Sequence, residues 1–380
     1  MVNADQLRMS NSNQKYNVPV IKKDQPDDNN KFLPTPKPTG PYPFHLDLQE
    51  VQPIISDQKI VFHMLGDTGS VFSSDFLGYV AGEMAKQYIH TGKPEDSPQF
   101  LYHLGDVVYN HGESREYQRQ FFKPFENYPS SIFAIAGNHD SDVNLDNEEP
   151  YASLDAFRAV FCDNEPHVVS FSGNSKRKSM IQPNLYWTLQ TPLAVIIGLH
   201  SNVPKYGIIP IEQRNWLKEE LIIANKQRPD KAVILCLHHA PYSADTNHGS
   251  SLAMIELLQG VFEETGIRPD IVFSGHVHNY QRFTKKYSDG HQVPFIVAGA
   301  GGYDGLHSIA QTNDRNFHSN SSLFEGVQLE NYCDNQHGFL KIAVEKKSKG
   351  LTLTGEYYTI SNSKELGTGS ALWDRFVVEI

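Results

Sequence analysis

Five short stretches decide how this chain folds: Gly66-Asp67-Thr68-Gly69, Gly105-Asp106-Val107-Val108-Tyr109, Gly137-Asn138-His139-Asp140, His238-His239-Ala240-Pro241 and Gly275-His276-Val277-His278. Each stretch follows a short apolar run that predicts a buried β-strand. Each also supplies carboxylate, amide or imidazole donors at the point where its strand would end. One such motif carries little information, but five in order indicate that their polar side chains share one site.

Helices and strands alternate around these motifs. Apolar runs predict strands at 59–65, 99–104, 131–136, 232–237 and 270–274. Amphipathic patterns predict helices at 75–88, 114–122, 151–161, 211–225 and 251–264. Segments without intervening helices predict an antiparallel meander at 167–171, 184–189 and 193–199, and later strands are expected at 294–298, 338–344, 351–359 and 374–380. This order favours an α/β fold in which two mixed β-sheets form a sandwich flanked by helices.

Residues 1–55 differ from the rest in composition, because a polar segment is followed by five prolines between Pro34 and Pro43. We expect an extended polar and proline-rich arm that either lies over the domain or forms a disordered tail. A single domain is expected over 56–380. Its polar segment 310–334 is too long for an ordinary connection, so we expect a lid or a surface insertion there.

The net charge of the 380 residues is −11, and no basic run is longer than Lys176-Arg177-Lys178. This charge argues against a nucleic-acid-binding surface. The three cysteines have neither a disulfide framework nor a metal-binding spacing. Because this numbering contains no signal peptide and no apolar run of about 18 residues, we expect no membrane span. The expected protein is soluble, cytoplasmic by default and secreted or periplasmic if a signal was removed, with its oligomeric state open.

The two aspartates that follow glycine, Asp67 and Asp106, are separated by the length of a strand–helix–strand unit. A right-handed crossover would place both carboxylates at the same edge of a sheet. The glycine before each one allows a tight turn that aims the side chain into a crevice. A carboxylate can bridge two cations roughly 3.5–4 Å apart, so this pair indicates a two-metal site.

The other motifs offer one amide oxygen, from Asn138, and several imidazoles. His276 and His278 are two positions apart, so on extended backbone they project to the same side. His238 and His239 are adjacent and cannot both point inward from a strand. We favour His239 as the ligand because Ala240-Pro241 follows it.

Together, the motifs GDTG, GDVVY, GNHD, HHAP and GHVH resemble those of the calcineurin-like metallophosphoesterase superfamily, in particular its purple acid phosphatase branch. The resemblance runs over about 59–300 and includes Gly299-Ala300-Gly301-Gly302-Tyr303, which is similar to the family's glycine-rich strand exit. Tyr109 decides the branch. Protein phosphatases of the superfamily have an aspartate at that position, whereas the purple enzymes have a tyrosine that binds ferric iron.

The resemblance implies two metal ions with different ligands. Fe(III) would be held by a phenolate, a carboxylate and an imidazole: Asp67, Tyr109 and His278. Fe(II), Zn or Mn would be held by an amide and two imidazoles: Asn138, His239 and His276. Asp106 would bridge the two ions.

The implied activity is hydrolysis of small-molecule phosphate esters, as an acid phosphatase that attacks monoesters with a metal-activated hydroxide at acidic pH. His139 is similar to the family's imidazole that contacts the phosphoryl group and can act as an acid. His248 either resembles the family's substrate-loop histidine or is a solvated loop residue. The alternatives are a phosphodiesterase on the same scaffold and, in another class, a non-catalytic phosphate- or metal-binding protein.

Three features depart from the purple enzymes. GNHD stands where GNHE is more usual, and Asn279 and Gln281 replace the plant-type alanine and glutamate. The segment before Asp67 is too short and polar for the β-sandwich domain of the plant enzymes, so the resemblance leaves dimerisation open.

Overall fold

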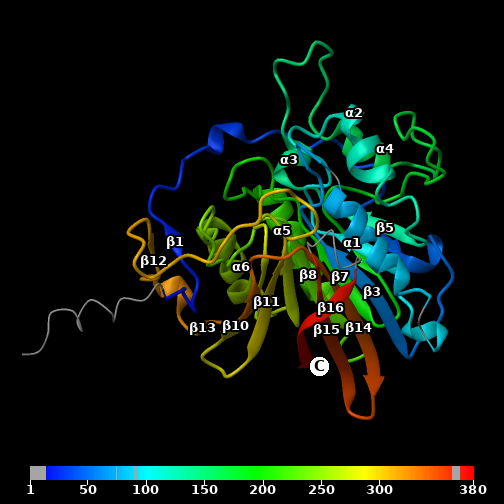
Figure 1. The fold of residues 1–380 in the computed structure, drawn as a ribbon. Coiled ribbons are helices and arrows are strands. Elements are labelled where there is room, and N and C mark those ends of the chain that lie inside the picture. Colours follow the sequence, from blue (N-terminus) through cyan, green and yellow to red (C-terminus); the bar gives the residue numbers. More distant parts are fainter. Residues whose placement is uncertain (1–13, 74, 90–91, 362–368) are drawn as a thin grey trace, which may run out of the picture.

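The computed structural model of the protein describes residues 14–73, 75–89, 92–361 and 369–380. Two β-sheets pack against each other at the centre, and helices cover their outer faces (Figure 1). Side chains of both sheets meet in one large buried core that includes Phe62, Phe133, Val195 and Ile234. The predicted α/β sandwich of two mixed sheets is therefore confirmed.

The smaller sheet brings the first three motifs to one edge. Its strand order is β16-β15-β14-β3-β4-β5. The parallel strands are β3 (Lys59–Leu65), β4 (Phe100–His103) and β5 (Ser131–Ala134). The antiparallel strands are β14 (Gly338–Lys347), β15 (Gly350–Ile360) and β16 (Ser370–Glu379). Because parallel strands end at the same edge, the loops after β3, β4 and β5 lie together.

The larger sheet carries the last two motifs, and its strand order is β13-β10-β11-β9-β8-β7-β6-β2. Its central strands run parallel: β7 (Ala194–Gly198), β8 (Ala232–Leu237), β9 (Ile271–Ser274) and β11 (Gln292–Ala298). The outer strands are β2 (His45–Asp47), β6 (Trp187–Gln190), β10 (Tyr280–Lys286) and β13 (Val327–Cys333). The fourth and fifth motifs follow β8 and β9.

Helices pack with their apolar faces against the outer side of each sheet. The smaller sheet is covered by α1 (Asp75–Lys86), α4 (Asp155–Phe161) and α2 (Ser114–Tyr117), which continues into a π-helical turn at Gln118–Phe122. The larger sheet is covered by α5 (Ile211–Asn225) and α6 (Leu252–Thr265). Short helices are α3 (Asn138–Ser141), η2 (Leu48–Glu50), η3 (Pro94–Asp96) and η5 (Ser322–Phe324). No helix in the described part of the chain is long and apolar enough to cross a membrane.

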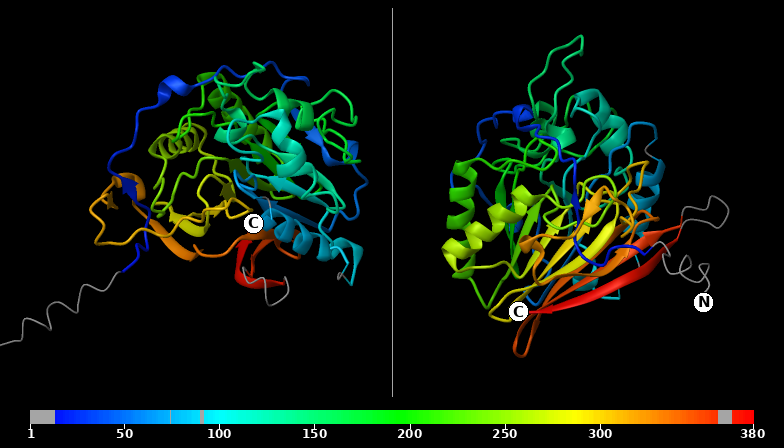
Figure 2. Two further views of the ribbon diagram at one scale, coloured as in Figure 1. Left: turned by 45° about the horizontal axis from the view of Figure 1, so that its top comes forward. Right: turned by 90° about the vertical axis from the view of Figure 1, so that its left-hand side faces the viewer.

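The described part of the N-terminal arm runs along the outside of the two sheets (blue in Figure 2). Its strand β1 (Ile21–Lys22) pairs with β12 (Phe317–His318), and a short helix η1 (Asn29–Lys31) follows. Further along, β2 pairs in parallel with β6 at the edge of the larger sheet. Leu46 and Leu48 are buried in the central core, so this end of the arm is part of the packed structure.

Two local predictions were wrong, and some strands were not predicted. Segment 167–171 forms no strand: Val168 is 54% exposed and makes an isolated bridge to Lys178, so β6 and β7 form a two-stranded hairpin instead. The helix predicted from residue 151 begins at Asp155, because the left-handed φ of +66° at Leu154 interrupts it. Strands β10 and β13 were not predicted, because charged and polar side chains interrupt their apolar pattern. Segment 310–334, where a lid or a surface insertion was predicted, contains β12, η5 and β13.

Candidate metal centre

The five motifs meet where β3, β4, β5, β8 and β9 end. Three residues of this region have left-handed backbone, with φ of +57° at Asp67, +54° at Asp106 and +67° at His276. Residues other than glycine adopt this conformation rarely, and they do so mostly at functional sites. A side chain at Gly137 would collide with the Asp106 carboxylate, so this glycine lets the third motif approach the second.

Asp67, Tyr109 and His278 bring three donor atoms together, which we call the first donor group. The Tyr109 hydroxyl lies 3.1 Å from His278 Nε2 and 3.4 Å from Asp67 Oδ1. The latter two atoms are 3.6 Å apart. His278 Nδ1 lies 3.1 Å from the carbonyl oxygen of Gly305. A carbonyl only accepts hydrogen bonds, so Nδ1 carries the ring proton and Nε2 turns its lone pair toward the group.

Asn138, His238 and His276 form a second donor group. Asn138 Oδ1 lies 3.1 Å from His238 Nε2 and 3.0 Å from His276 Nδ1. His238 Nδ1 donates to the carbonyl oxygen of Leu104 at 2.8 Å, so Nε2 faces the amide oxygen and holds either a second ring proton or a metal ion. Two acceptors in contact repel each other unless a proton or another cation lies between them. The arrangement therefore fits a metal ion.

Asp106 faces both donor groups. Its Oδ2 lies 3.3 Å from His238 Nε2, and its Oδ1 accepts the backbone N–H of His139 at 2.9 Å. Ligand atoms of Asp106, His238 and His276 all lie within 4.8 Å of one another. On the other side, burial and then the charge of Asp106 raise the pKa of Tyr109 well above its ordinary value. A carboxylate between two donor groups can bridge two cations.

The electrostatics of the site favour added positive charge. Burial lowers the pKa of His238, yet the Asp106 carboxylate raises it to about 9 overall. Burial lowers the pKa of His276 and His278 well below the ordinary value, so these imidazoles stay neutral, as metal ligands must be. Burial also raises the pKa of Asp67 well above its ordinary value. A cation between these groups would compensate the buried carboxylates.

His239 was the predicted ligand of the two adjacent histidines, but the structure places His238 beside Asp106 and Asn138. Its orientation comes from the Leu104 carbonyl, which belongs to a distant segment and leaves no local trace in the sequence. His239 is also buried, and its Nδ1 lies 2.7 Å from Ser201 Oγ. Its ring packs 4.3 Å from that of His276, so it contacts a member of the second donor group.

Replacing the two histidines in turn is expected to separate these roles. His238→Ala removes a donor of the second group and should lower metal affinity by more than the roughly 10–100-fold typical of an outer supporting residue. His239→Ala should stay within that range. Metal content after dialysis against graded chelator measures both variants. A His238→Ala protein that keeps two metals while His239→Ala loses one would reverse the assignment.

Two side chains that the sequence did not single out hold the motif loops in place. The Asp140 carboxylate accepts the backbone N–H groups of Val107, Val108 and Gly137, which ties the second motif to the third. Gln120 Oε1 accepts the N–H groups of Ser70 and Tyr109, and its Nε2 donates to the Tyr109 carbonyl. Gln120 lies in a polar stretch whose sequence carries no signal for this role.

His139 and His248 both line a cavity of about 390 Å³ over the donor groups. The His139 ring packs 4.3 Å from that of Tyr109, and its Nδ1 donates to the carbonyl of Asn110 at 2.8 Å. His248 is 9% exposed, and its ring lies 4.1 Å from that of His276. Asp245 fixes the loop by accepting the N–H groups of His248 and Gly249 and by pairing with His307 at 3.1 Å.

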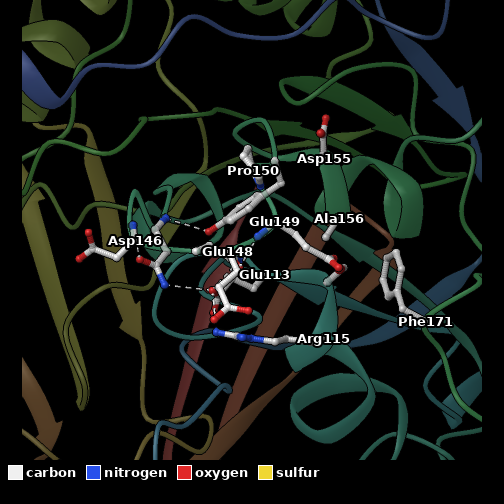
Figure 3. A pocket seen from close by; sticks show the side chains of 13 residues that line it. Glu113, Arg115, Asp146, Glu148, Glu149, Pro150, Asp155, Ala156 and Phe171 are labelled. Atoms are coloured by element: carbon white, nitrogen blue, oxygen red, sulfur yellow. Dashed lines mark hydrogen bonds and ion pairs between the residues drawn. The ribbon is translucent and has the colours of Figure 1, made fainter.

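A larger cavity of about 640 Å³ lies elsewhere, between the loop that follows α3 and helices α2 and α4 (Figure 3). Its lining contains none of the residues predicted for the site. Arg115 is the cation among side chains that include the carboxylates of Glu113, Asp146, Glu148, Glu149 and Asp155. This negative lining would repel a phosphate ester, so the cavity over the donor groups is the better candidate site.

Comparisons with known proteins agree with this geometry. A profile of the calcineurin-like phosphoesterase family matches residues 62–280. Purple acid phosphatase 1 of Ipomoea batatas is 28% identical over 240 residues, which cover 60% of this chain and 43% of that protein. The Fe(3+)-Zn(2+) purple acid phosphatase 12 of Arabidopsis thaliana is 26% identical over 234 residues, which cover 60% and 44%. The chain thus matches less than half the length of these relatives.

The solved structure of GAP50, the anchor in the inner membrane complex of Plasmodium, superimposes with a TM-score of 0.54 at 14% identity, over 85% of this chain and 89% of that one. That likeness shows a shared fold alone. The profile covers more than half of the chain, and all five motifs lie within the matched residues. The chain therefore belongs to the calcineurin-like phosphoesterase family, whose members are generally metal-dependent hydrolases.

Proposed function

We propose that this protein is a dinuclear metallophosphatase of the purple acid phosphatase type that hydrolyses small-molecule phosphate monoesters. The observation that carries the proposal is the position of the Tyr109 hydroxyl, 3.1 Å from His278 Nε2 and 3.4 Å from Asp67 Oδ1. A phenolate beside a carboxylate and an imidazole is a hard donor set that suits Fe(III). The named relatives from plants support the same branch.

The second donor group, with one amide and two imidazoles, would hold Zn, Mn or Fe(II), with His238 in the place first given to His239. Asp106 would be shared by both ions. When bound, two such ions supply charge that neutralises the phosphoryl oxygens and lower the pKa of water. Residues 56–380 would form the catalytic domain, with the arm of residues 1–55 laid on it.

The protein's own side chains would orient the ester and manage its protons. His139 donates from Nδ1 to the Asn110 carbonyl, so a ring that also carries a proton at Nε2 would donate from that atom to the phosphoryl group or give that proton to the leaving oxygen. His248, which lines the same cavity, would also contact the ester. Because Asp245 holds three consecutive backbone N–H groups of its loop, from Asn247 to Gly249, His248 is positioned before substrate arrives.

Hydrolysis rates of paired aryl esters test the proposal. The metal-loaded protein should hydrolyse 4-nitrophenyl phosphate with a higher kcat/KM than bis(4-nitrophenyl) phosphate, and with an acidic optimum. A preference for the diester of about tenfold or more would instead indicate a phosphodiesterase. A protein that holds two metals and hydrolyses neither ester would be a non-catalytic binding protein.

A further inference from the structure

The wall of the active-site cavity includes part of the N-terminal arm. Pro26, Asp28 and Lys31 line the cavity together with Lys205 from the loop after β7 and His248 from the loop after β8. These arm residues lie outside the five motif stretches. The arm therefore contributes directly to the surface that a substrate meets.

Hydrogen bonds fix this part of the arm to the loops around the site. The Asp28 carboxylate accepts the backbone N–H of Lys205 at 3.2 and 3.1 Å. Asn202 pairs with the backbone of Leu33 in both directions, at 2.9 and 2.8 Å. On the other side, the N–H of Val20 donates to the Ser243 carbonyl at 2.9 Å. Anchors on both sides of η1 make the arm a fixed wall.

Two lysines line this part of the cavity, Lys31 of the arm and Lys205 of the loop after β7. Lys205 is half-buried, and within the described residues its ammonium makes no hydrogen bond or ion pair. Burial lowers the pKa of Lys205, the charges of Lys22 and Lys31 lower it as well, and the charges of Asp245 and Asp28 partly offset this shift. The nearby carboxylates are already engaged, since Asp245 holds its own loop and His307.

Lys31 is exposed and lies 3.8 Å from Asp28, whose carboxylate also holds the backbone of Lys205. The Asp28 carboxylate therefore contacts both cavity-lining lysines. Lys22 is a third cation nearby, and its ammonium donates to the Asn247 carbonyl at 2.8 Å. Around Lys205, the three lysines thus outnumber the two neighbouring carboxylates, Asp28 and Asp245, in a chain of net charge −11. A half-buried ammonium without a partner is stabilised when an anion binds it.

We propose that Lys205 and Lys31 form a cationic subsite that binds a second anionic group of the substrate. This inference rests on the proposed function, because it takes the reacting phosphoryl group to be held at the donor groups. The substrates would then be small phosphate esters that carry a further phosphate, placed toward the arm. The 390 Å³ cavity has room for more than one phosphoryl group.

A matched pair of esters tests the subsite on the full-length, metal-loaded protein. Butane-1,4-diyl bisphosphate and 4-hydroxybutyl phosphate differ only by the second phosphoryl group. Charged hydrogen bonds favour the bisphosphate, and its kcat/KM should exceed that of the monophosphate by roughly tenfold, after correction for its two equivalent ends. Lys205→Gln should remove most of this preference while leaving the monophosphate rate within a factor of two or so. The glutamine keeps the backbone N–H that binds Asp28.

Lys37→Gln is the control, because Lys37 is an exposed lysine of the same arm outside the cavity lining. It should keep the wild-type preference. Equal kcat/KM for the two esters in wild type, or an unchanged preference in Lys205→Gln, would overturn the subsite. Titration calorimetry with both esters separates failure of the subsite from failure of the proposed function. If neither ester is hydrolysed, tighter binding of the bisphosphate that Lys205→Gln abolishes still supports the subsite. Equal binding of the two esters refutes the subsite.

Discussion

Asp106→Asn is expected to lower kcat/KM by about 10³-fold or more, which corresponds to roughly 4 kcal/mol of lost transition-state stabilisation. Asp106 is the carboxylate that faces both donor groups, so the substitution removes charge from both metal positions at once. Asparagine has the same shape, and its Oδ1 can still accept the His139 N–H, so the fold should be retained. Metal analysis, circular dichroism and kinetics on one preparation measure the three effects.

A matched control for this variant is Asp142→Asn. Asp142 also lines the cavity, but it pairs with His111 at 3.1 Å and is 38% exposed. It should keep both metals and lose far less activity. An Asp106→Asn protein with two metals and near-normal turnover would show that Asp106 is not the shared ligand.

His139→Ala is expected to lower kcat by roughly 10²–10⁴-fold, the range of general acid–base contributions, while metal content stays unchanged. The His139 side chain bonds to the Asn110 carbonyl and packs on Tyr109, and it makes no bond to Asn138 or Asp106 among the described contacts. The backbone N–H that binds Asp106 is retained in the variant. Loss of a metal ion from His139→Ala would make this residue a ligand and would overturn its role here.

Much of the site could be predicted because its residues follow strands whose order is simple. Asp67, Asp106 and Asn138 follow three parallel neighbours, and the spacing of His276 and His278 places both imidazoles on one side. The strand pattern was clear wherever both faces of a strand are buried, as in β3 and β8. These are local properties of the sequence.

The remaining features depend on contacts between distant segments. The tautomer and direction of His238 come from Leu104, and the place of the arm comes from Asp28 meeting the backbone of Lys205. Gln120 and Asp140 act by accepting backbone N–H groups, a role that many polar residues could have. The edge strand β13 of the larger sheet and its neighbour β10 escaped prediction because polar or charged side chains interrupt their apolar pattern, as at Glu330 of β13 and Arg282 of β10.

The central claim is that Tyr109 binds ferric iron in a dinuclear centre, and a visible absorption spectrum recorded alongside metal analysis tests it most directly. Protein purified in air, or reconstituted with iron, should contain two metal ions and be violet or pink, because a phenolate bound to Fe(III) gives a charge-transfer band. Tyr109→Phe should bleach the colour without unfolding the protein, since it removes only the hydroxyl near Asp67 and His278. A colourless wild type loaded with iron, or a Tyr109→Phe protein that stays coloured, would contradict the claim and leave only membership of the wider phosphoesterase family.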